Sequence, residues 1–590
     1  MANYGLVSVF NKRNVVGFSQ FLSTKGYNLL SSTGTARLLK ENSLDITEIS
    51  DYTGSPEILG GRVKTLHPKI YGGILQDTYN PEHVQDMRKA EVPPISVVVT
   101  NLYPFEEKNC IENIDIGGVT LIRAAAKNHD SVLVVVDPDD YQTIMNQYDS
   151  IMANDESGKS LRRWYARKAF HYIANYDIAI ANYFENETHH IKNGGMPETF
   201  YRTYVKKQDL KYGCNPHQDK AATYAIKRPL KPAALPFTVE NGTPGYINIL
   251  DALYSWQLVN EVHDTLGMIC AASFKHNAPA GVGTSLPLSS TLLETYDLKK
   301  DEVTSTSATA FIRARNCDPL SSFGDFIAIS GIVDVETAKL IKREVSDGII
   351  APDYTQEALN ILKQKKNGGY IILVGKKDKD YTNEEVVEFK EVNGCAVMQS
   401  VNRAKANISY FENNVAENKD ISIFRKMDMI LANITLKYTP SNSVAAAYDG
   451  QVIGIGAGQQ NRVDCVKLVK KKVDNWNLRQ HSKTIAHNKK LKGDGLKRQE
   501  RINGIMSYIE KDPEFLKHKD SIISGISSKT EMVLASDAFF PFPDSIDVAA
   551  EMGVTHIIQP GGSIMDKAVT DAANKYNMSM SLTNVRVFTH

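Results

Sequence analysis

Cysteine is scarce in this chain of 590 residues, and its positions do not suggest a metal site or a disulfide framework. No Cys-x-x-Cys pair occurs, and several of the six cysteines lie in apolar runs, as reduced thiols of cytoplasmic proteins do. They are Cys110, Cys214, Cys270, Cys317, Cys395 and Cys465. The pattern argues against a cysteine zinc site, and we expect a protein without zinc.

Long apolar runs and an excess of charge of one sign are also missing. No apolar segment approaches membrane-spanning length, and the first ten residues lack the basic start of a secretory signal. Lys+Arg and Asp+Glu both number 68, so no net field attracts nucleic acid or an anionic membrane. We therefore expect a soluble, cytoplasmic protein with neither nucleic acid nor membrane as a partner.

The sequence that remains is ordinary globular sequence, long enough for more than one domain. Apolar residues make up 42% and charged residues 23% of the chain. A chain of 590 residues is too long for a single core, so two to four domains are expected. Residues 185–210 are polar and glycine-rich, which favours a linker. We place a boundary near residue 200 and predict domains over 1–200 and 201–590.

Predicted strands and helices alternate at short spacing in the first 200 residues. The strands are expected over 5–10, 27–31, 46–50, 95–102 and 131–136, and the helices over 15–26, 35–42, 119–128 and 139–148. This alternation predicts an α/β fold whose parallel sheet is doubly wound, with helices on both faces.

Two loops of this first part have the composition of anion sites. Ser31-Ser-Thr-Gly-Thr35 leaves a strand and enters a helix, where N–H groups and hydroxyls can hold a phosphate. An ordinary helix cap is the alternative. Gly60–Pro68 contains Arg62, Lys64 and His67 and no acid to neutralise them, which indicates either an anion site or a solvated surface loop.

Groups suited to proton transfer follow the strongest predicted strand. Asn101-Leu-Tyr-Pro104 ends that strand, and Asp115-Ile-Gly-Gly118 enters a helix that contains Lys127. An aspartate, a tyrosine and lysines around a phosphate site would form proton-transfer and oxyanion machinery.

The most informative stretch of the second part is Ser273–Pro279. The apolar run Gly267–Phe274 predicts a buried strand, with Lys275 and His276 at its carboxyl end, and we expect a turn at Pro279–Gly281. Ligands bind at this edge of open α/β sheets. A lysine cation favours a neutral neighbouring imidazole, which can accept a proton near pH 7. The alternative is an ordinary surface Lys-His pair.

The glycine-rich segment Gly450–Arg462 contains Gly-x-Gly-x-Gly but does not predict a dinucleotide site. Its glycines lie in an alternating, strand-like run, and no acidic residue follows about twenty positions later. We expect the glycines to allow the backbone to approach a ligand closely.

Three segments of the first part resemble the bifunctional AICAR transformylase/IMP cyclohydrolase family. They are Gly61–Pro68 (GRVKTLHP), Asn101–Phe105 (NLYPF) and Asp115–His129 (DIGGVTLIRAAAKNH). The segments around Lys275-His276, Leu436–Val444 and Gly450–Arg462 extend the resemblance to nearly the whole chain. It implies formyl transfer from 10-formyltetrahydrofolate to AICAR, followed by dehydrative closure of formyl-AICAR to IMP.

The resemblance also implies folds for both parts. It implies a methylglyoxal-synthase-like fold for the first part. For the second part it implies two cytidine-deaminase-like units, with a basic helical segment over about 462–530. A weak internal echo agrees with this duplication: Phe323–Phe326 before Ile349–Pro352, and Ser536–Phe542 before Ile557–Pro560. The His-x-Glu and Pro-Cys-x-x-Cys zinc signature of deaminases is absent, which disfavours hydrolytic deamination.

In the first part, the resemblance implies roles for fifteen residues. The residues implied to catalyse ring closure are Lys64, Tyr103, Asp115 and Lys127. The residues implied to bind the substrate are Ser8, Lys12, Ser31, Ser32, Thr33, Gly34, Thr35, Arg62, Thr65, Asn101 and Gly117. Phe10 and Thr33 depart from the family pattern, in which a small polar residue and a glycine are usual.

For formyl transfer, the chemistry of these side chains leads us to expect that His276 is the general base, Lys275 the oxyanion or leaving-group partner, and Asn442 a second oxyanion donor. The residues implied to bind nucleotide or folate are Lys211, Tyr212, Phe323, Asp347, Asn461, Arg462, Asn503, Phe539, Asp544 and Arg586. Arginines suit a phosphate and phenylalanines suit flat rings. Lys211 stands where relatives have Arg, and Asn461 where they often have Ser. The resemblance further implies a homodimer with shared transformylase sites and a monovalent cation.

Residues 462–501 are strongly basic, with 13 Lys or Arg against four Asp or Glu. The bland interpretation is a solvated helical face. The sharper one is a surface that attracts an anionic substrate, such as the glutamate tail of a folate.

Two rival functions remain open from the sequence. One is a nucleotide-sensing protein that binds AICAR or IMP without turnover. The other is a transformylase whose first part has lost activity, for which Phe10 and Thr33 give some support.

Overall fold

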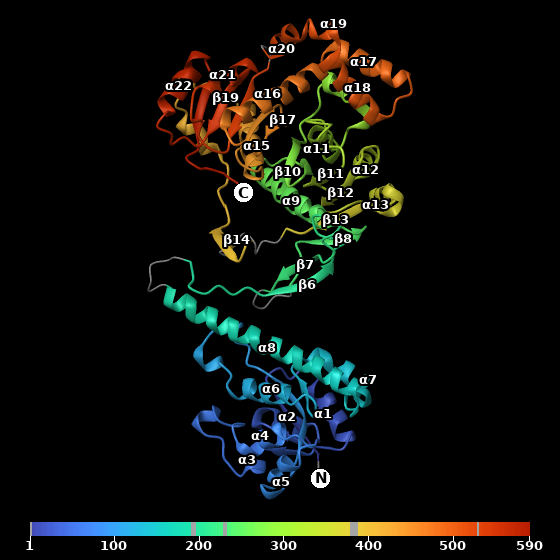
Figure 1. The fold of residues 1–590 in the computed structure, drawn as a ribbon, viewed down its shortest axis with the longest axis vertical. Coiled ribbons are helices and arrows are strands. Elements are labelled where there is room, and N and C mark those ends of the chain that lie inside the picture. Colours follow the sequence, from blue (N-terminus) through green and yellow to red (C-terminus); the bar gives the residue numbers. More distant parts are fainter. Residues whose placement is uncertain (1–2, 190–195, 228–232, 378–386, 528–529) are drawn as a thin grey trace. The chain divides into compact units, whose positions relative to one another are not determined.

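The computed structural model describes residues 3–189, 196–227, 233–377, 387–527 and 530–590 (Figure 1). By internal contacts the chain forms two compact units. Unit 1 comprises residues 1–205 and 225–234, and unit 2 comprises residues 206–224 and 235–590. Among the described residues, no helix is both long and apolar enough to span a membrane.

Unit 1 is built on a five-stranded parallel sheet with the strand order β3-β2-β1-β4-β5. The strands are β1 (Asn3–Val9), β2 (Tyr27–Ser31), β3 (Ile46–Glu48), β4 (Ile95–Asn101) and β5 (Leu133–Val135). The apolar run of β4 is buried on both faces, as expected when helices cover both sides of a parallel sheet. The chain leaves β1 toward β2 on one side and returns to β4 on the other, so the strand order reverses beside β1.

The helices of unit 1 are α1 (Val15–Thr24), α2 (Thr33–Glu41), α3 (Ile49–Thr53), α4 (Pro68–Leu75), α5 (Pro81–Lys89), α6 (Gly117–Lys127), α7 (Tyr141–Ile151) and α8 (Glu156–His189). Four of them (α1, α2, α6 and α7) lie within a few residues of their predicted positions, and four more (α3, α4, α5 and α8) were not predicted. α2 begins at Thr33, two residues before its predicted start, because Ser32 already has extended backbone and acts as the N-cap. α8 packs on α6, α7 and β5 and contributes its buried tyrosines to the core.

Unit 2 is built on an eleven-stranded mixed sheet with the order β20-β19-β18-β16-β17-β10-β9-β11-β12-β13-β8. The strands are β8 (Phe237–Asn241), β9 (Cys270–Lys275), β10 (Ala278–Thr284), β11 (Asp325–Ile329), β12 (Ser346–Ala351), β13 (Ile371–Gly375), β16 (Val444–Tyr448), β17 (Gln451–Gly456), β18 (Met532–Ser536), β19 (Val554–Gln559) and β20 (Ser579–Leu582). Two small two-stranded sheets accompany it: β6 (Tyr204–Asp209) with β7 (Ala222–Ile226), and β14 (Val387–Val392) with β15 (Cys395–Ser400).

Helices cover both faces of this sheet. They are α9 (Tyr246–Leu266), α10 (Ser290–Thr295), α11 (Thr306–Arg315), α12 (Val335–Lys342), α13 (Gln356–Lys363), α15 (Ile423–Lys437), α16 (Arg462–Arg479), α17 (Ser482–Gly493), α18 (Arg498–Lys511), α19 (Pro513–Leu516), α20 (Lys519–Ser527), α21 (Asp544–Glu551) and α22 (Asp566–Lys575). The predicted basic helical segment corresponds to α16 through α20, which lie in the orange part of unit 2 in Figure 1.

The turn after the Lys275-His276 motif is not where we predicted it. Lys275 pairs with Ala278, so β9 and β10 form a tight hairpin whose two-residue loop is His276-Asn277. Both loop residues have positive φ, 57° and 59°, as a type I′ hairpin turn requires. Pro279–Gly281, the predicted turn, belongs to β10. Gly281 is needed there because a Cβ would lie 2.2 Å from the carbonyl oxygen of Ala314 in α11.

The strand pattern of the large sheet occurs twice. The β9–β10 hairpin is followed by antiparallel β11 and then by parallel β12 and β13. The β16–β17 hairpin is likewise followed by antiparallel β18 and then by parallel β19 and β20. The two halves meet where β10 pairs with β17.

These strand directions bring several loops to one edge of the large sheet. β9 ends at this edge, so β10, β11 and β12 all begin there. β17 runs opposite to β10 and ends at the same edge, where β16 begins. β18, β19 and β20 then end there as well. The Lys275-His276 turn, Asn442 before β16 and Phe539 after β18 therefore share an edge, although more than 260 residues separate the first from the last.

The structure explains the glycines at positions 454 and 456 of β17 by helix packing rather than by the predicted approach of a ligand. A Cβ on Gly456 would lie 2.5 Å from the carbonyl oxygen of Cys465, and one on Gly454 would lie 3.1 Å from that of Val469. Both carbonyls belong to α16. The glycines therefore allow a strand and a helix to pack closely, and the prediction that they admit a ligand is wrong for these two positions.

Candidate active sites

Asn101 joins the ends of β1 and β4 at the point in unit 1 where the strand order reverses. Its side-chain Oδ1 accepts hydrogen bonds from the backbone N–H groups of Phe10, at 2.7 Å, and Asn11, at 2.8 Å. Reversal points of parallel sheets open a crevice at the carboxyl ends of the strands. Asn101 is buried, and its two hydrogen bonds hold the segment after β1 against the end of β4.

The predicted phosphate loop lies at the same end, after β2. Ser32 caps α2 without a side-chain capping bond, so the N–H groups of the first helical turn are available to an anion. The hydroxyls of Ser8 and Ser32 are 2.7 Å apart, which links β1 to the loop. Gly34 has open space where a Cβ would stand. Ser31 is buried and donates to the carbonyl of Val7, so its hydroxyl supports the strand end.

Lys12 supplies a cation beside this helix start. Its Nζ donates to Thr35 Oγ1 at 2.6 Å and to the carbonyl of Val9. Burial and the nearby Lys64 cation lower the pKa of Lys12 to about 8. An anion bound beside Lys12 would stabilise the charged form of this lysine.

The basic loop 60–68 has acidic partners that its sequence alone does not contain. Lys64 Nζ lies 3.3 Å from Glu57 Oε2, and Arg62 pairs with Glu112. Glu57 also accepts a hydrogen bond from Thr33 Oγ1 at 2.5 Å. Acids from neighbouring segments thus pair with two of the three basic groups of the loop, and the choice between an anion site and a solvated loop stays a prediction.

Tyr103, Asp115, Thr65 and Gly117 lie close together around the start of α6. Burial raises the pKa of Asp115, and the backbone N–H groups of Gly118 and Tyr103, which hydrogen-bond to its carboxylate, oppose the rise. A Cβ on Gly117 would lie 2.7 Å from Thr65 Oγ1. The ring of Tyr103 meets that of Phe10 edge-on, at 5.5 Å between centroids.

Lys127 is the predicted catalytic residue that this group does not include. It is exposed at the last position of α6, whereas Gly117 is the first residue of the helix and Asp115 lies two residues before it. Ten residues of α-helix span about 15 Å. The neighbouring Asn128 donates to the carbonyls of Ile74 and Gln76, at the far end of α4.

In unit 2 a first group of predicted residues surrounds the Lys275-His276 turn. Lys275 Nζ donates to the carbonyl oxygen of Phe323 at 2.8 Å, and the ring of Phe323 is 40% exposed. His276 is exposed at the tip of the hairpin. Asp347, at the start of β12, is partly exposed and pairs with Lys366 at 2.6 Å. These groups face the open edge of the sheet.

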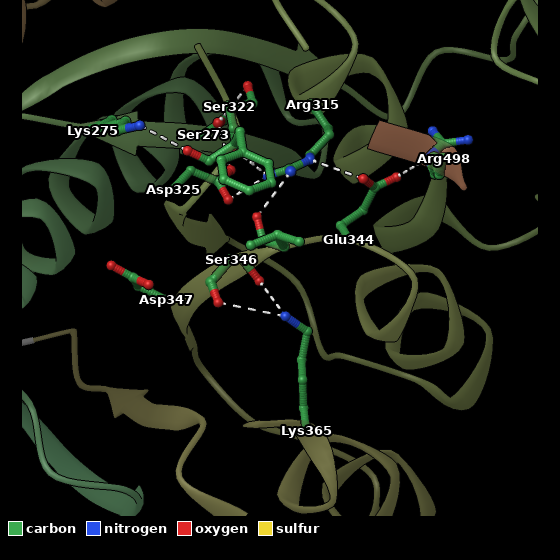
Figure 2. A network of polar contacts seen from close by, with 12 residues as sticks. Ser273, Lys275, Arg315, Ser322, Asp325, Glu344, Ser346, Asp347, Lys365 and Arg498 are labelled. Carbon is green, nitrogen blue, oxygen red and sulfur yellow. Dashed lines mark hydrogen bonds and ion pairs between the residues drawn. The ribbon is translucent and has the colours of Figure 1, made fainter. Parts of the chain in front are cut away.

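A buried ionic network lies beneath this group (Figure 2). Asp325 is fully buried, pairs with Arg315 and accepts a hydrogen bond from Ser273 Oγ at 2.5 Å. Arg315 also lies 3.5 Å from Glu344, which in turn binds Arg498 of α18 at 2.5 Å. Ser273 is two residues before Lys275, so the network fixes the end of β9 and ties it to the helical segment.

A second group lies at the start of β16 and the end of β18. Asn442 Oδ1 accepts a hydrogen bond from Arg462 Nη2 at 2.9 Å, so its amide NH₂ is the part left to meet a substrate. Phe539 is 41% exposed, and Asp544 is exposed at the start of α21. Val587 N–H donates to the carbonyl of Asp537, so the segment with Arg586 also crosses this edge.

Arg462 itself is not placed like a phosphate-binding arginine. It is 6% exposed, forms an ion pair with the fully buried Asp537 and donates to the carbonyl of Ser443 at 2.9 Å. Its charge is thus already compensated inside the protein. Arg586, in contrast, is exposed, lies over the ring of Phe588 and has no carboxylate partner among the described residues.

Four other predicted binding residues make their side-chain contacts with residues outside these two groups. Asn461 is the N-cap of α16 and bonds Asp464. Asn503 is exposed on α18, where it accepts a hydrogen bond from Gln499. Lys211 and Tyr212 lie between β6 and β7, with Lys211 Nζ 5.6 Å from the centre of the Tyr212 ring. Within the described ranges, no hydrogen bond or ion pair joins these four residues to either group.

Comparison with known proteins decides the family. The AICARFT/IMPCHase bienzyme family matches residues 125–472, and the MGS-like domain matches residues 14–135. The chain belongs to the AICARFT/IMPCHase bienzyme family. The bifunctional purine biosynthesis protein PurH of Persephonella marina (strain DSM 14350 / EX-H1) is 34% identical over 600 residues, with 100% of both chains covered. PurH of Thermoanaerobacter sp. (strain X514) is 35% identical over 603 residues, also with 100% of both covered.

Membership in the bienzyme family confirms the predicted family and the MGS-like fold of the first part. The likeness of the second part to cytidine deaminases stays a prediction, to which the repeated strand pattern of the large sheet adds support. The roles of individual residues in the bienzyme chain also stay predictions, now constrained by where the structure places each side chain.

Several residues that shape these sites were missed from the sequence. Glu57, Asp325 and Asp537 pair with Lys64, Arg315 and Arg462. The separations are 7, 10 and 75 residues, and none of these pairs has the spacing of neighbours on one helix face, so no local pattern marks the acids. Asp251, within α9, accepts the Asn277 N–H of the hairpin turn at 2.7 Å. The sequence could have indicated Asp251 only as a single acidic residue at an apolar position of α9.

Proposed function

We propose that unit 1 closes formyl-AICAR to IMP and that unit 2 transfers the formyl group of 10-formyltetrahydrofolate to AICAR. Full-length similarity to the bienzyme family is the observation that supports both activities in one chain. The two units contribute separate clusters of polar and titratable residues at open sheet edges, as two independent reactions require.

For formyl transfer, His276 acts as the general base. The AICAR amine is a weak nucleophile because its lone pair is delocalised into the ring and the carboxamide. As its nitrogen attacks the formyl carbon, the imidazole takes the amine proton, an effect typically worth about 10²–10⁴ in rate. The exposed tip of a hairpin turn lets the ring reach a substrate that approaches from solvent.

Lys275 and Asn442 act on the charge that develops on the formyl oxygen. Lys275 Nζ uses one of its three N–H donors in the bond to the carbonyl oxygen of Phe323. Two donors remain to stabilise the oxyanion or to protonate the departing folate nitrogen. The amide NH₂ of Asn442 is the second donor. Phe323 and Phe539, both about 40% exposed, offer flat surfaces for the pterin or purine-precursor rings.

For ring closure, the loop after β2 and Lys12 hold the phosphate of formyl-AICAR. The carboxamide nitrogen attacks the formyl carbon, and the intermediate then loses water. Lys64 and Tyr103 stabilise the oxyanion and help hydroxide leave, and Asp115 takes or returns the proton. A raised pKa suits Asp115 to proton transfer, because a group titrating nearer neutrality exchanges protons more readily.

The two groups of unit 2 are complementary halves of a transformylase site, and we propose that a homodimer completes it. One group contains the base and Lys275, and the other contains Asn442, Phe539 and Arg586. Within the described residues, no hydrogen bond or ion pair links the two. The cytoplasmic location and a monovalent cation are further expectations from the family.

One assay separates the proposal from its rivals. Purified protein is mixed with AICAR and 10-formyltetrahydrofolate, and the purine product is identified; formyl-AICAR is supplied alone in a parallel reaction. IMP in both reactions supports the proposal. Formyl-AICAR without IMP, in both, indicates an inactive unit 1. A rise in Tm with AICAR but no product would indicate a nucleotide sensor.

A further inference from the structure

Asp251 is the only carboxylate whose hydrogen bond to the His276-Asn277 turn the structure describes. It lies in α9, is 5% exposed, and accepts the Asn277 N–H at 2.7 Å through Oδ1. A turn with two residues at positive φ is costly for side chains other than glycine. The buried acceptor helps hold this turn, and therefore the backbone that bears His276.

The second half of the sheet contains the same device. Asp428, in α15, is 2% exposed and accepts the N–H groups of Asp449 at 2.9 Å and Gly450 at 2.7 Å. These two residues form the turn of the β16–β17 hairpin. A buried aspartate on the preceding helix thus fixes the hairpin turn in both halves, and burial raises the pKa of each carboxyl to about 6.

The two aspartates differ in their charged surroundings. Asp428 forms an ion pair with Arg425 at 2.9 Å. Asp251 has no Lys or Arg partner among the described residues, and the group of opposite charge that acts on it is His276. The other charges that act on Asp251 are Asp347 of β12 and Asp325 of β11, which have Lys366 and Arg315 as their own partners.

We propose that Asp251 is the positioning residue of His276: it fixes the turn and stabilises the imidazolium that forms when His276 takes the AICAR amine proton. This rests on the proposed formyl transfer. Burying a carboxylate without a cation costs free energy. When His276 takes the proton of the AICAR amine, its imidazole becomes positively charged and offsets that cost during proton transfer. The proton then leaves the imidazole for the released folate nitrogen or for solvent, which restores the starting state.

The test compares Asp251→Asn with Asp428→Asn in the full chain. Asparagine keeps an oxygen that can accept the turn N–H and removes only the charge. We expect Asp251→Asn to lower kcat for formyl transfer by about 10–100-fold, with KM for AICAR within about twofold. The acid limb of its pH profile should move to lower pH, because the negative charge that favours imidazolium is gone. Asp428→Asn should leave both readouts unchanged, and both variants should cyclise formyl-AICAR normally.

Three outcomes would overturn the proposal: an unchanged kcat and acid limb in Asp251→Asn, equal losses in both variants, or a loss without a shift of the limb. If Asp251→Asn does not fold, Asp251→Glu and Asp251→Gln form a second pair, of which only Glu should keep the acid limb. If the unaltered protein forms no formyl-AICAR, the proposed function fails instead.

Discussion

Replacement of Arg462 by methionine tests whether this arginine supports the fold or binds phosphate. Arg462→Met keeps a long apolar stem but leaves the Asp537 carboxylate fully buried with only the N–H and hydroxyl of Ser443 as partners. Removing one member of a buried ion pair costs about 3–5 kcal/mol. The entropy of unfolding is about 2.1 cal/mol/K per residue, so in a unit of 375 residues a change of 1 kcal/mol shifts Tm by about 1.3 °C, and we expect a fall of about 4–6 °C.

Calorimetry measures the unfolding transition of unit 2, and cyclisation of formyl-AICAR reports whether unit 1 is intact. Arg586→Met is the matched control, because this arginine is exposed and lacks a carboxylate partner among the described residues. It should keep Tm within about 1 °C, since surface substitutions usually change stability little, and raise KM for AICAR. The reasoning is refuted if Arg462→Met keeps its Tm and raises only KM.

Four further outcomes are expected. His276→Ala should abolish formyl transfer and spare cyclisation; loss of both in a folded variant would contradict separate sites. Asn101→Ala should leave two loop N–H groups without their acceptor and lower the stability of unit 1 by about 1–3 kcal/mol, measured by denaturant unfolding together with a fall in cyclisation; unchanged values would show that the loops have other support. The pKa of Asp428 is raised to about 6, so the folded state keeps a proton that the unfolded state loses near pH 4, and stability falls as pH rises through this window. The stability of Asp428→Asn relative to the unaltered protein should therefore rise by up to about 3 kcal/mol from pH 4 to pH 7, on top of a loss, constant with pH, from leaving Arg425 without its carboxylate; a difference that is constant with pH would exclude this. Raising salt should raise the apparent KM for folate but not for AICAR if the basic helices attract its glutamate tail, whereas no change favours a solvated face.

Local patterns predicted most of the elements that hold the sites. β2 has its predicted bounds, and α1 and β4 lie within a few residues of theirs. Apolar periodicity and short polar connections are sufficient for this, since they depend on neighbours along the chain. The long matches in Asp115–His129 and around Lys275 also carried the family assignment, which the comparisons confirm.

Features that depend on contacts distant in sequence were not accessible in this way. The turn at His276-Asn277 was misplaced because Pro279 and Gly281 are stronger turn formers, yet the antiparallel register and the packing of α11 require them in β10. The acid that pairs with Arg462 lies 75 residues away in the sequence, directly after β18, and the acid that pairs with Lys64 lies seven residues before it, outside the basic loop. Burial, which separates Arg462 from Arg586, is likewise a property of the folded sheet.

The two glycines of β17 set the distance between that strand and α16, and this has a consequence for the second group of unit 2. A single methyl at position 456 would press on the backbone of Cys465, less than one helical turn from Arg462. The helix would shift, and the guanidinium that orients the amide of Asn442 would shift with it. The absence of a side chain at Gly456 thus sets how closely β17 and α16 pack. Through that distance it determines the direction in which the amide of Asn442 points at the substrate-facing edge.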